Sequence, residues 1–277
     1  MTAPARRPVP GPLLRLLAVV ASVCAVIGLA LVAAAGATGE ARAHDADTAP
    51  RATALAPRPE TPPPTVAPAP APDAATSAAG EPAVPGGPVS VLFLGDSVAW
   101  TAADALAPLA GGYGTTIRNA GMQGCGVVQG GPYRYFGAQY DATERCDTWA
   151  DAWQASVDAG PPDVTVVIVG RWELMDRVHD GHWTSIGDPA FDAFLGDELD
   201  RAITVASSRG APVALCTQPY YRRGPRPDGG TWPEDDPARV ERMNALIRDA
   251  AARRPGVVTL VDLGGRLSPG GVLAMEI

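Results

Sequence analysis

Val89-Ser90-Val91-Leu92-Phe93-Leu94 leads directly into Gly95-Asp96-Ser97, and a stretch with helical spacing follows. The apolar run is typical of a strand buried on both faces of a parallel sheet. Ser97 would then lie where the strand turns into a helix, and backbone N–H groups at a helix N-terminus stabilise negative charge. This junction is a candidate site for a serine nucleophile. Ser97 is also a good helix cap, and that role alone would explain it.

Further apolar runs and helix patterns alternate along the rest of the chain. The expected strands are Thr115–Ile117, Val164–Val169, Val213–Cys216 and Val257–Val261. The expected helices are Ser97–Leu109, Thr148–Val157, one from Asp188-Pro189 to about Gly210, and one from Asp236-Pro237 to Pro255-Gly256. This alternation predicts a three-layer α/β sandwich with a parallel sheet over residues 89–277. Ligands of such sheets bind at the carboxyl ends of the strands.

The chain before residue 89 has a different composition. Residues 1–15 carry three arginines and no acid, and residues 16–36 are apolar and uncharged. A helix of that length spans about 30 Å, the thickness of a bilayer core. We expect a cytoplasmic N-terminus (1–15), a transmembrane helix or uncleaved signal anchor (16–36) and a disordered Pro/Ala-rich linker (37–88). The domain would then be extracytoplasmic at the cell membrane. Cleavage of a signal peptide at Ala41-Arg42-Ala43, which would give a secreted protein, is the alternative.

Charge and cysteine content exclude several classes of partner. The net charge of −8 disfavours nucleic acid. We predict no cofactor and no metal, because no Cys/His spacing fits a zinc site and no phosphate loop supports a nucleotide-binding, flavodoxin-like protein. In an exported domain Cys125 and Cys146 would form a disulfide, whereas Cys216, in an apolar run, is expected to be buried.

Two segments at expected strand ends carry a family resemblance. Gly95-Asp96-Ser97 and the stretch from Asn119 to Gly124 resemble the first two blocks of the SGNH hydrolases, also called GDSL hydrolases. The resemblance runs from about Pro88 to the C-terminus. It implies an SGNH fold, Ser97 as the nucleophile and Gly124 as a backbone N–H donor of the oxyanion hole, with Gly121 the weaker match for that donor. Gly95, Asp96 and Asn119 would support them.

The third block departs from the family pattern. The family has Gly-x-Asn-Asp, and this chain has Gly170-Arg171-Trp172-Glu173. The indole N–H of Trp172 could replace the Asn as a donor to the oxyanion; alternatively, Trp172 packs beside a solvated or ion-paired Glu173. The variant resembles SGNH domains associated with membrane acyltransferases. The resemblance thus implies ester hydrolysis or O-acyl (acetyl) transfer on a cell-surface polysaccharide, with a membrane acyltransferase as a partner.

The family's last block, Asp-x-x-His, has no match after the final apolar run. Asp262 begins the expected approach, but no histidine lies beyond His182. We therefore expect a C-terminally truncated domain with little or no esterase activity. Asp176-Arg177-Val178-His179 has the right spacing but follows the third strand, so the sheet would present it from the wrong loop. Asp180-Gly181-His182, directly after it, is expected to be a polar loop exposed to water. The alternative function is a non-catalytic glycan-binding or scaffold ectodomain.

Aromatic and basic residues gather in two of the expected loops. One set is Tyr133, Tyr135, Phe136 and Tyr140; the other is Tyr220, Tyr221, Arg222 and Arg223. At the carboxyl edge of a sheet such side chains could form a sugar platform or hold an acyl carrier. Packing and solubility would explain them equally well.

Overall fold

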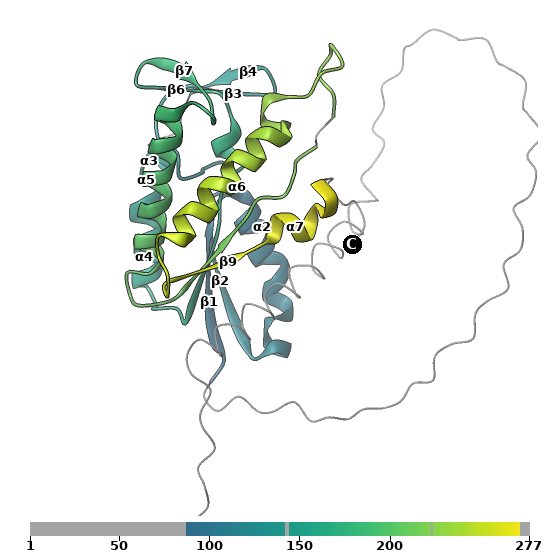
Figure 1. The fold of residues 1–277 in the computed structure, drawn as a ribbon. Helices are drawn as coiled ribbons and strands as arrows, with labels where there is room; N and C mark the ends of the chain where they lie inside the picture. Colours follow the sequence, from purple (N-terminus) through teal and green to yellow (C-terminus); the bar gives the residue numbers. More distant parts are fainter. Residues whose placement is uncertain (1–86, 142–143, 223, 272–277) are drawn as a thin grey trace, which may run out of the picture.

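A parallel sheet of five strands forms the middle layer of the domain. The computed structural model describes residues 87–141, 144–222 and 224–271. The strand order is β2-β1-β5-β8-β9. Figure 1 labels β1, β2 and β9 of this sheet. The strands are β1 (Val89–Gly95), β2 (Thr115–Gly121), β5 (Val164–Ile168), β8 (Val213–Cys216) and β9 (Val258–Val261). All five predicted strands are confirmed. The order reverses between β1 and β5, where doubly wound sheets form a ligand crevice at the carboxyl edge.

Helices cover both faces of this sheet. They are α2 (Ser97–Leu106), α4 (Trp149–Asp158), α5 (Pro189–Ala206), α6 (Pro237–Ala252) and α7 (Leu263–Leu267). Val91 and Phe93 pack with α2 and α7, whereas Leu92 and Leu94 pack under α4, α5 and α6. Successive side chains of a strand point to opposite faces, so both faces of β1 are buried. The predicted three-layer α/β architecture is confirmed.

The helix starts follow the predicted capping residues. The Asp188 carboxylate accepts a hydrogen bond from the Ala190 N–H at 2.9 Å, and Asp236 accepts one from Ala238 at 2.9 Å. The first helix is shorter than expected. It ends at Leu106, and the chain continues as a 3₁₀ segment, Ala107–Tyr113, because Pro108 lacks the N–H that an α-helix needs.

A second, antiparallel sheet replaces loops that were expected to be irregular. Its order is β4-β3-β6-β7, and it lies beyond the carboxyl ends of β1, β2 and β5, in the upper part of Figure 1. The strands are β3 (Tyr133–Tyr135), β4 (Ala138–Tyr140), β6 (Arg177–His179) and β7 (His182–Thr184). The remaining short elements are α3 (Glu144–Asp147) and the 3₁₀ turns Trp172–Leu174, Pro233–Asp235 and Pro269–Gly271.

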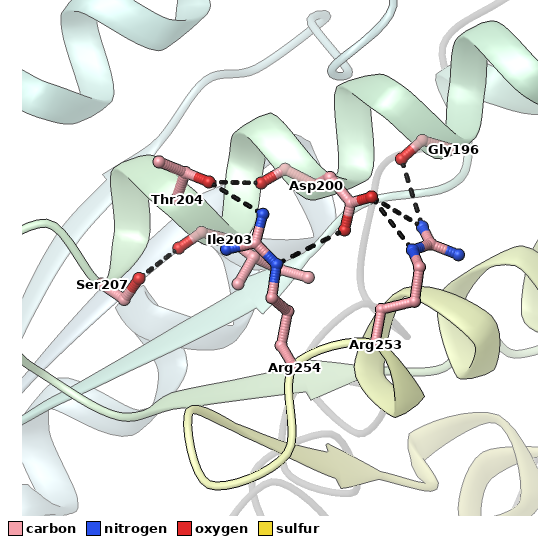
Figure 2. A network of polar contacts seen from close by, with 7 residues as sticks. All are labelled: Gly196, Asp200, Ile203, Thr204, Ser207, Arg253 and Arg254. Atoms are coloured by element: carbon pink, nitrogen blue, oxygen red, sulfur yellow. Dashed lines mark hydrogen bonds and ion pairs between the residues drawn. The ribbon is translucent and has the colours of Figure 1, made fainter.

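A polar network joins α5 to the end of α6. Figure 2 shows Asp200 between two guanidinium groups: Arg253 donates to its carboxylate at 3.0 Å, and Arg254 lies 3.8 Å from it. Arg253 and Arg254 also reach the Gly196 carbonyl and the Thr204 hydroxyl. Exposed ion pairs of this kind contribute about 1 kcal/mol or less, so the apolar layer beneath them holds the two helices together.

The expected N-terminal segments lie outside the described residues. This applies to residues 1–15, to the predicted transmembrane helix 16–36 and to the linker up to residue 86. Within the described part of the chain, no helix is both long and apolar enough to cross a bilayer.

Candidate active site

Ser97 is the first residue of α2 and lies half-buried at the carboxyl end of β1, beside the point where the strand order reverses. Asp96, not Ser97, caps the helix: its Oδ1 accepts a hydrogen bond from the Val98 N–H at 2.7 Å. The expected alternative role of Ser97 as the cap is therefore wrong. Among the described residues, the Ser97 hydroxyl has no hydrogen-bond partner.

Glycines in the first two blocks allow the backbone of these blocks to lie close to neighbouring segments. Gly95 has φ +144°, and a Cβ there would clash with the Ile168 carbonyl of β5. The Gly95 carbonyl accepts from the Met122 N–H at 2.7 Å, which ties the first block to the second. A Cβ at Gly121 would clash with the backbone of Trp100 in α2. Only residues without side chains allow these backbones to meet.

Asn119 lies in β2 and not in a loop, because β2 continues to Gly121. Its Nδ2 donates to the Trp100 carbonyl at 2.9 Å, and its Oδ1 accepts from the Gly121 N–H at 3.0 Å. Both partners are backbone groups near the start of α2 or the end of β2. Asn119 therefore holds the second block against the helix that carries Ser97.

Gly124 is held between a disulfide and an indole ring. The predicted Cys125–Cys146 disulfide is present. Gly124 has φ +80°, and its missing Cβ would lie 3.9 Å from Cζ2 of Trp172. Arg145 donates to the carbonyl of the preceding residue, Gln123. These contacts place the proposed oxyanion glycine directly beside the third block.

Trp172 begins the 3₁₀ turn that follows β5. Its ring lies 5.8 Å from that of Tyr133 and 5.7 Å from that of Tyr135, between centroids. Its Nε1 is buried and has no acceptor among the described residues. Burying a donor without an acceptor costs about 1–3 kcal/mol, so this N–H is available to an oxygen that enters the site.

Glu173 is fully buried, which corrects the expectation of a solvated acid. Its Oε1 accepts from the Val127 N–H at 2.7 Å, and its Oε2 has no partner in the described chain. Burial raises the pKa of Glu173, against the opposing effects of that hydrogen bond and of the nearby Arg177 charge. Gly126 makes room for it, since a Cβ there would clash with Oε1.

Asp96 is the second fully buried carboxyl of the site. Burial, and then repulsion from Glu173, raise the pKa of Asp96 to about 7, although the Val98 N–H opposes the shift. Its Oδ2 also lacks a partner among the described residues. Two buried carboxyls that repel each other rarely ionise together. Burial and their mutual repulsion therefore favour the protonated form of these carboxyls.

Gln218 and Tyr221 are further polar residues of the site. Tyr221 belongs to the predicted aromatic and basic loop, whereas Gln218 was not among the predicted site residues. Gln218 follows β8, and the amide of Asn244 in α6 bonds both its backbone N–H (2.7 Å) and its carbonyl (2.9 Å). Tyr221 donates its hydroxyl to Oε1 of Gln218. Burial, then the Asp96 charge, raise the pKa of Tyr221 well above its ordinary value. The position of Gln218 just after a strand was the available indication.

Gly170 and Arg171 connect the third block to these residues. A Cβ at Gly170, which has φ +149°, would clash with the Gln218 side chain. Arg171 lies over the Tyr221 ring, with Cζ 4.4 Å from the ring centroid, and pairs with Asp235 at 2.8 Å. The segment between β8 and α6 is thereby fastened to the end of β5.

The Asp176-to-His179 string does not form a catalytic pair. Asp176 pairs with Arg239 at 2.7 Å, and the His179 ring packs on Phe194 of α5 with centroids 4.3 Å apart. His179 ends β6, and Asp180-Gly181-His182, expected to be an exposed polar loop, forms the exposed turn between β6 and β7 and the first residue of β7. His182 is exposed in the same hairpin.

Asp262 follows β9 and caps α7. It accepts from the Gly265 N–H at 3.2 Å and from the Thr217 hydroxyl at 2.9 Å. Cys216, the last residue of β8, is buried, as predicted. In the described ranges, no group of three His, Cys, Asp or Glu side chains is placed to hold a metal ion.

A doubly wound sheet with a serine at its switch point and a glycine loop beside it defines an SGNH-type hydrolase domain. The family model of the SGNH domain fused to AT3 domains matches residues 67–272. The chain belongs to this family. A search of curated proteins finds no match to the chain.

Proposed function

We propose that this domain hydrolyses or transfers an O-acyl group, most simply acetyl, on a cell-surface glycan, with Ser97 as the nucleophile. The observation that carries the proposal is the position of Ser97: it starts α2 at the switch point, and Asp96 relieves it of the capping role. Membership of the SGNH family supports the reaction class.

The geometry supports a set of oxyanion donors. Ser97 Oγ would attack the acyl carbonyl carbon, and the carbonyl oxygen would become negatively charged. The N–H groups of Ser97 and Gly124 and the indole N–H of Trp172 would donate to this oxygen. The Trp172 donor has no other acceptor among the described residues. The sugar oxygen would then leave with a proton, and water or a second hydroxyl would take the acyl group from the serine.

The proton of Ser97 needs a base, and the described residues place no histidine beside it. We therefore propose that the 277-residue chain has at most weak esterase activity. Loss of the base in serine hydrolases costs roughly four orders of magnitude in turnover or more. The buried Asp96 is an unsuitable substitute, because one of its oxygens accepts the Val98 N–H and no hydrogen bond joins its carboxyl to the Ser97 hydroxyl among the described residues.

The location and the partner are also part of the proposal. The apolar segment 16–36 would anchor the chain, 37–88 would tether the domain, and the domain would lie outside the cytoplasm. The Cys125–Cys146 disulfide is in keeping with an oxidising compartment. Because the family is described by its fusion to AT3 domains, a membrane acyltransferase is the partner that we propose.

A second function, glycan binding without catalysis, is favoured by the same missing base. The two functions differ in the reactivity of Ser97. A fluorophosphonate reagent should label the wild-type chain slowly at one site, and Ser97→Ala should abolish the label in intact-mass spectra. Ser156→Ala, at a helical serine that is half-buried like Ser97, is the matched control. Labelling that persists in Ser97→Ala would reject Ser97 as the nucleophile.

A further inference from the structure

An open groove of about 450 Å³ lies at the edge of the small sheet. It is lined by Tyr135, Phe136, Ala138, Tyr140 and Trp232, which we call the aromatic groove. Four of the five residues carry rings. Of the four rings, Tyr135 and Tyr140 come from β3 and β4, and Phe136 comes from the turn between these strands. Trp232 comes from the segment between β8 and α6.

The turn of this hairpin has an unusual residue for its backbone conformation. Phe136 has φ +48° and Gly137 has φ +77°, as in the two-residue turns that usually contain Asn-Gly or Asp-Gly. The hairpin of β6 and β7 has such a pair, Asp180-Gly181. A bulky residue at positive φ costs about 1 kcal/mol or more. Phe136 adopts this unfavourable conformation, and its ring lies 5.4 Å from the ring of Trp232, between centroids, in the aromatic groove.

The aromatic groove is continuous with the candidate active site through Trp172. The Tyr135 ring, in the groove, lies 5.7 Å from the Trp172 ring, and Cζ2 of the same indole lies 3.9 Å from the Cβ position of Gly124. Tyr133 links the two regions as well, because its ring stacks on Tyr140 at 5.6 Å and meets Trp172 at 5.8 Å. The Trp172 indole therefore lies close to both the groove and the oxyanion glycine.

The residues that line the groove favour one chemical class of ligand over another. An alkyl chain would be expected to find Leu, Ile or Val side chains, and Ala138 is the one aliphatic residue in this lining. A pyranose ring has an apolar face of C–H groups that stacks on aromatic rings, and hydroxyls at its edge. Tyr135 and Tyr140 supply phenol groups that can hydrogen-bond such hydroxyls.

We propose that the aromatic groove binds a pyranose ring of the glycan, one unit away from the sugar whose ester Ser97 attacks. The inference rests on the proposed function and deepens it by assigning the site that holds the substrate chain. Binding in the groove does not need the Ser97 hydroxyl. The groove and the nucleophile can therefore be tested separately.

The test is saturation-transfer difference NMR on the full 277-residue chain, with aromatic protons saturated. The probes are partly O-acetylated hexasaccharides of β-1,4-linked xylose, mannose and N-acetylglucosamine. We expect at least one of them to show transfer to ring C–H protons. Phe136→Asn and Tyr140→Ala should each weaken that binding about tenfold, as expected when one stacking ring is lost.

The variants include their own controls for folding. Phe136→Asn places a favoured residue in the turn, so its thermal midpoint should be unchanged or higher than that of the wild type. Tyr113→Ala removes a ring of matched exposure, 48% against 47% for Tyr140, outside the groove, and should leave binding unchanged.

Two results would overturn the proposal: no transfer to any probe, or equal transfer in the wild type, Phe136→Asn and Tyr140→Ala. Ser97→Ala separates this proposal from the proposed function. Sugar binding that survives in Ser97→Ala supports the groove whatever the reactivity of Ser97. Fluorophosphonate labelling of Ser97 without sugar binding would keep the nucleophile and reject the groove.

Discussion

Asp96 and Glu173 each accept a hydrogen bond from a backbone N–H through one carboxylate oxygen. The other carboxylate oxygen of each is buried and has no hydrogen-bond partner in the described chain. The bonded oxygens fix the start of α2 and the loop at Val127. Burial, and then the charges of both carboxyls, raise the pKa of the Tyr221 hydroxyl, although the Arg171 charge opposes the shift. Burial and mutual repulsion favour the protonated form of each carboxyl.

Asp96→Asn should remove a pH dependence of stability. The pKa of Asp96 is raised from 3.8 to about 7 in the folded chain, so folding favours its protonated form. The free energy of unfolding therefore falls as pH rises from about 4 to about 7, by up to about 4 kcal/mol, and the loss is complete above that range. Asp96→Asn should equal the wild type near pH 4 and exceed it at pH 8 in urea unfolding.

Asp188→Asn is the control for this experiment. Asp188 also caps a helix with its side chain, but it is exposed. Its substitution should leave the difference between pH 4 and pH 8 unchanged. If Asp96→Asn tracked the wild type at every pH, the raised pKa of Asp96 would be refuted.

Arg177 should be strongly coupled to Glu173. It is buried, and burial lowers its pKa to about 10 while the Glu173 charge opposes the shift. Arg177→Met leaves a buried carboxyl without its cation, which typically costs about 3 kcal/mol. In a Glu173→Gln background the cost should be clearly smaller. A double-mutant cycle from urea unfolding measures the difference, and strict additivity would show that the two side chains do not interact.

Gly126→Ala should destabilise the site far more than an ordinary glycine substitution. A Cβ at Gly126 would clash with Oε1 of Glu173, the atom that holds Val127. We expect a loss of about 2 kcal/mol or more. Gly196→Ala, within α5 and with open space around it, should instead add about 1 kcal/mol of stability. Thermal melts of both variants compare these effects, and a neutral Gly126→Ala would reject the packing described for Glu173.

Trp172→Phe tests the indole N–H as an oxyanion donor. The change keeps a ring against Gly124 and removes the buried N–H. Loss of one such donor lowers the rate by roughly two orders of magnitude in known oxyanion holes. The rate of fluorophosphonate labelling of Ser97 should fall accordingly, with Trp183→Phe, an exposed tryptophan of β7, as the control. Equal labelling rates in Trp172→Phe and the wild type would leave Trp172 with a packing role alone.

The main sheet was predictable because its central strands, β1, β5 and β8, bury both faces. A run such as Val91 to Leu94 has no polar side to place in water, and a parallel strand is the structure that suits it. The helix starts at Asp188 and Asp236 were predictable for a local reason, since capping depends on neighbouring residues. The small sheet was not, because its strands have three residues each, too few to show a period.

The chemistry of the site was only partly visible in the sequence. The Gly95-Asp96-Ser97 motif fixed the position of Ser97, but which residue caps α2 depends on the rotation of the turn. Burial of Glu173 and contact between Gly170 and Gln218 depend on segments that are distant in the sequence. The Asp180-Gly181 turn carried a local hairpin signal, whereas Phe136-Gly137 did not, because its unusual first residue conceals the turn.

The rate of aryl acetate hydrolysis by the 277-residue chain, with and without added imidazole, tests the central claim most directly. Imidazole can supply the missing base, and Ser97→Ala corrects for hydrolysis by imidazole itself. We expect the wild type to match Ser97→Ala in plain buffer and to exceed it as imidazole is added. Rapid turnover in plain buffer that disappears in Ser97→Ala would contradict the account, because a base would then already be in place. No difference between the two proteins at any imidazole concentration would reject Ser97 as the nucleophile.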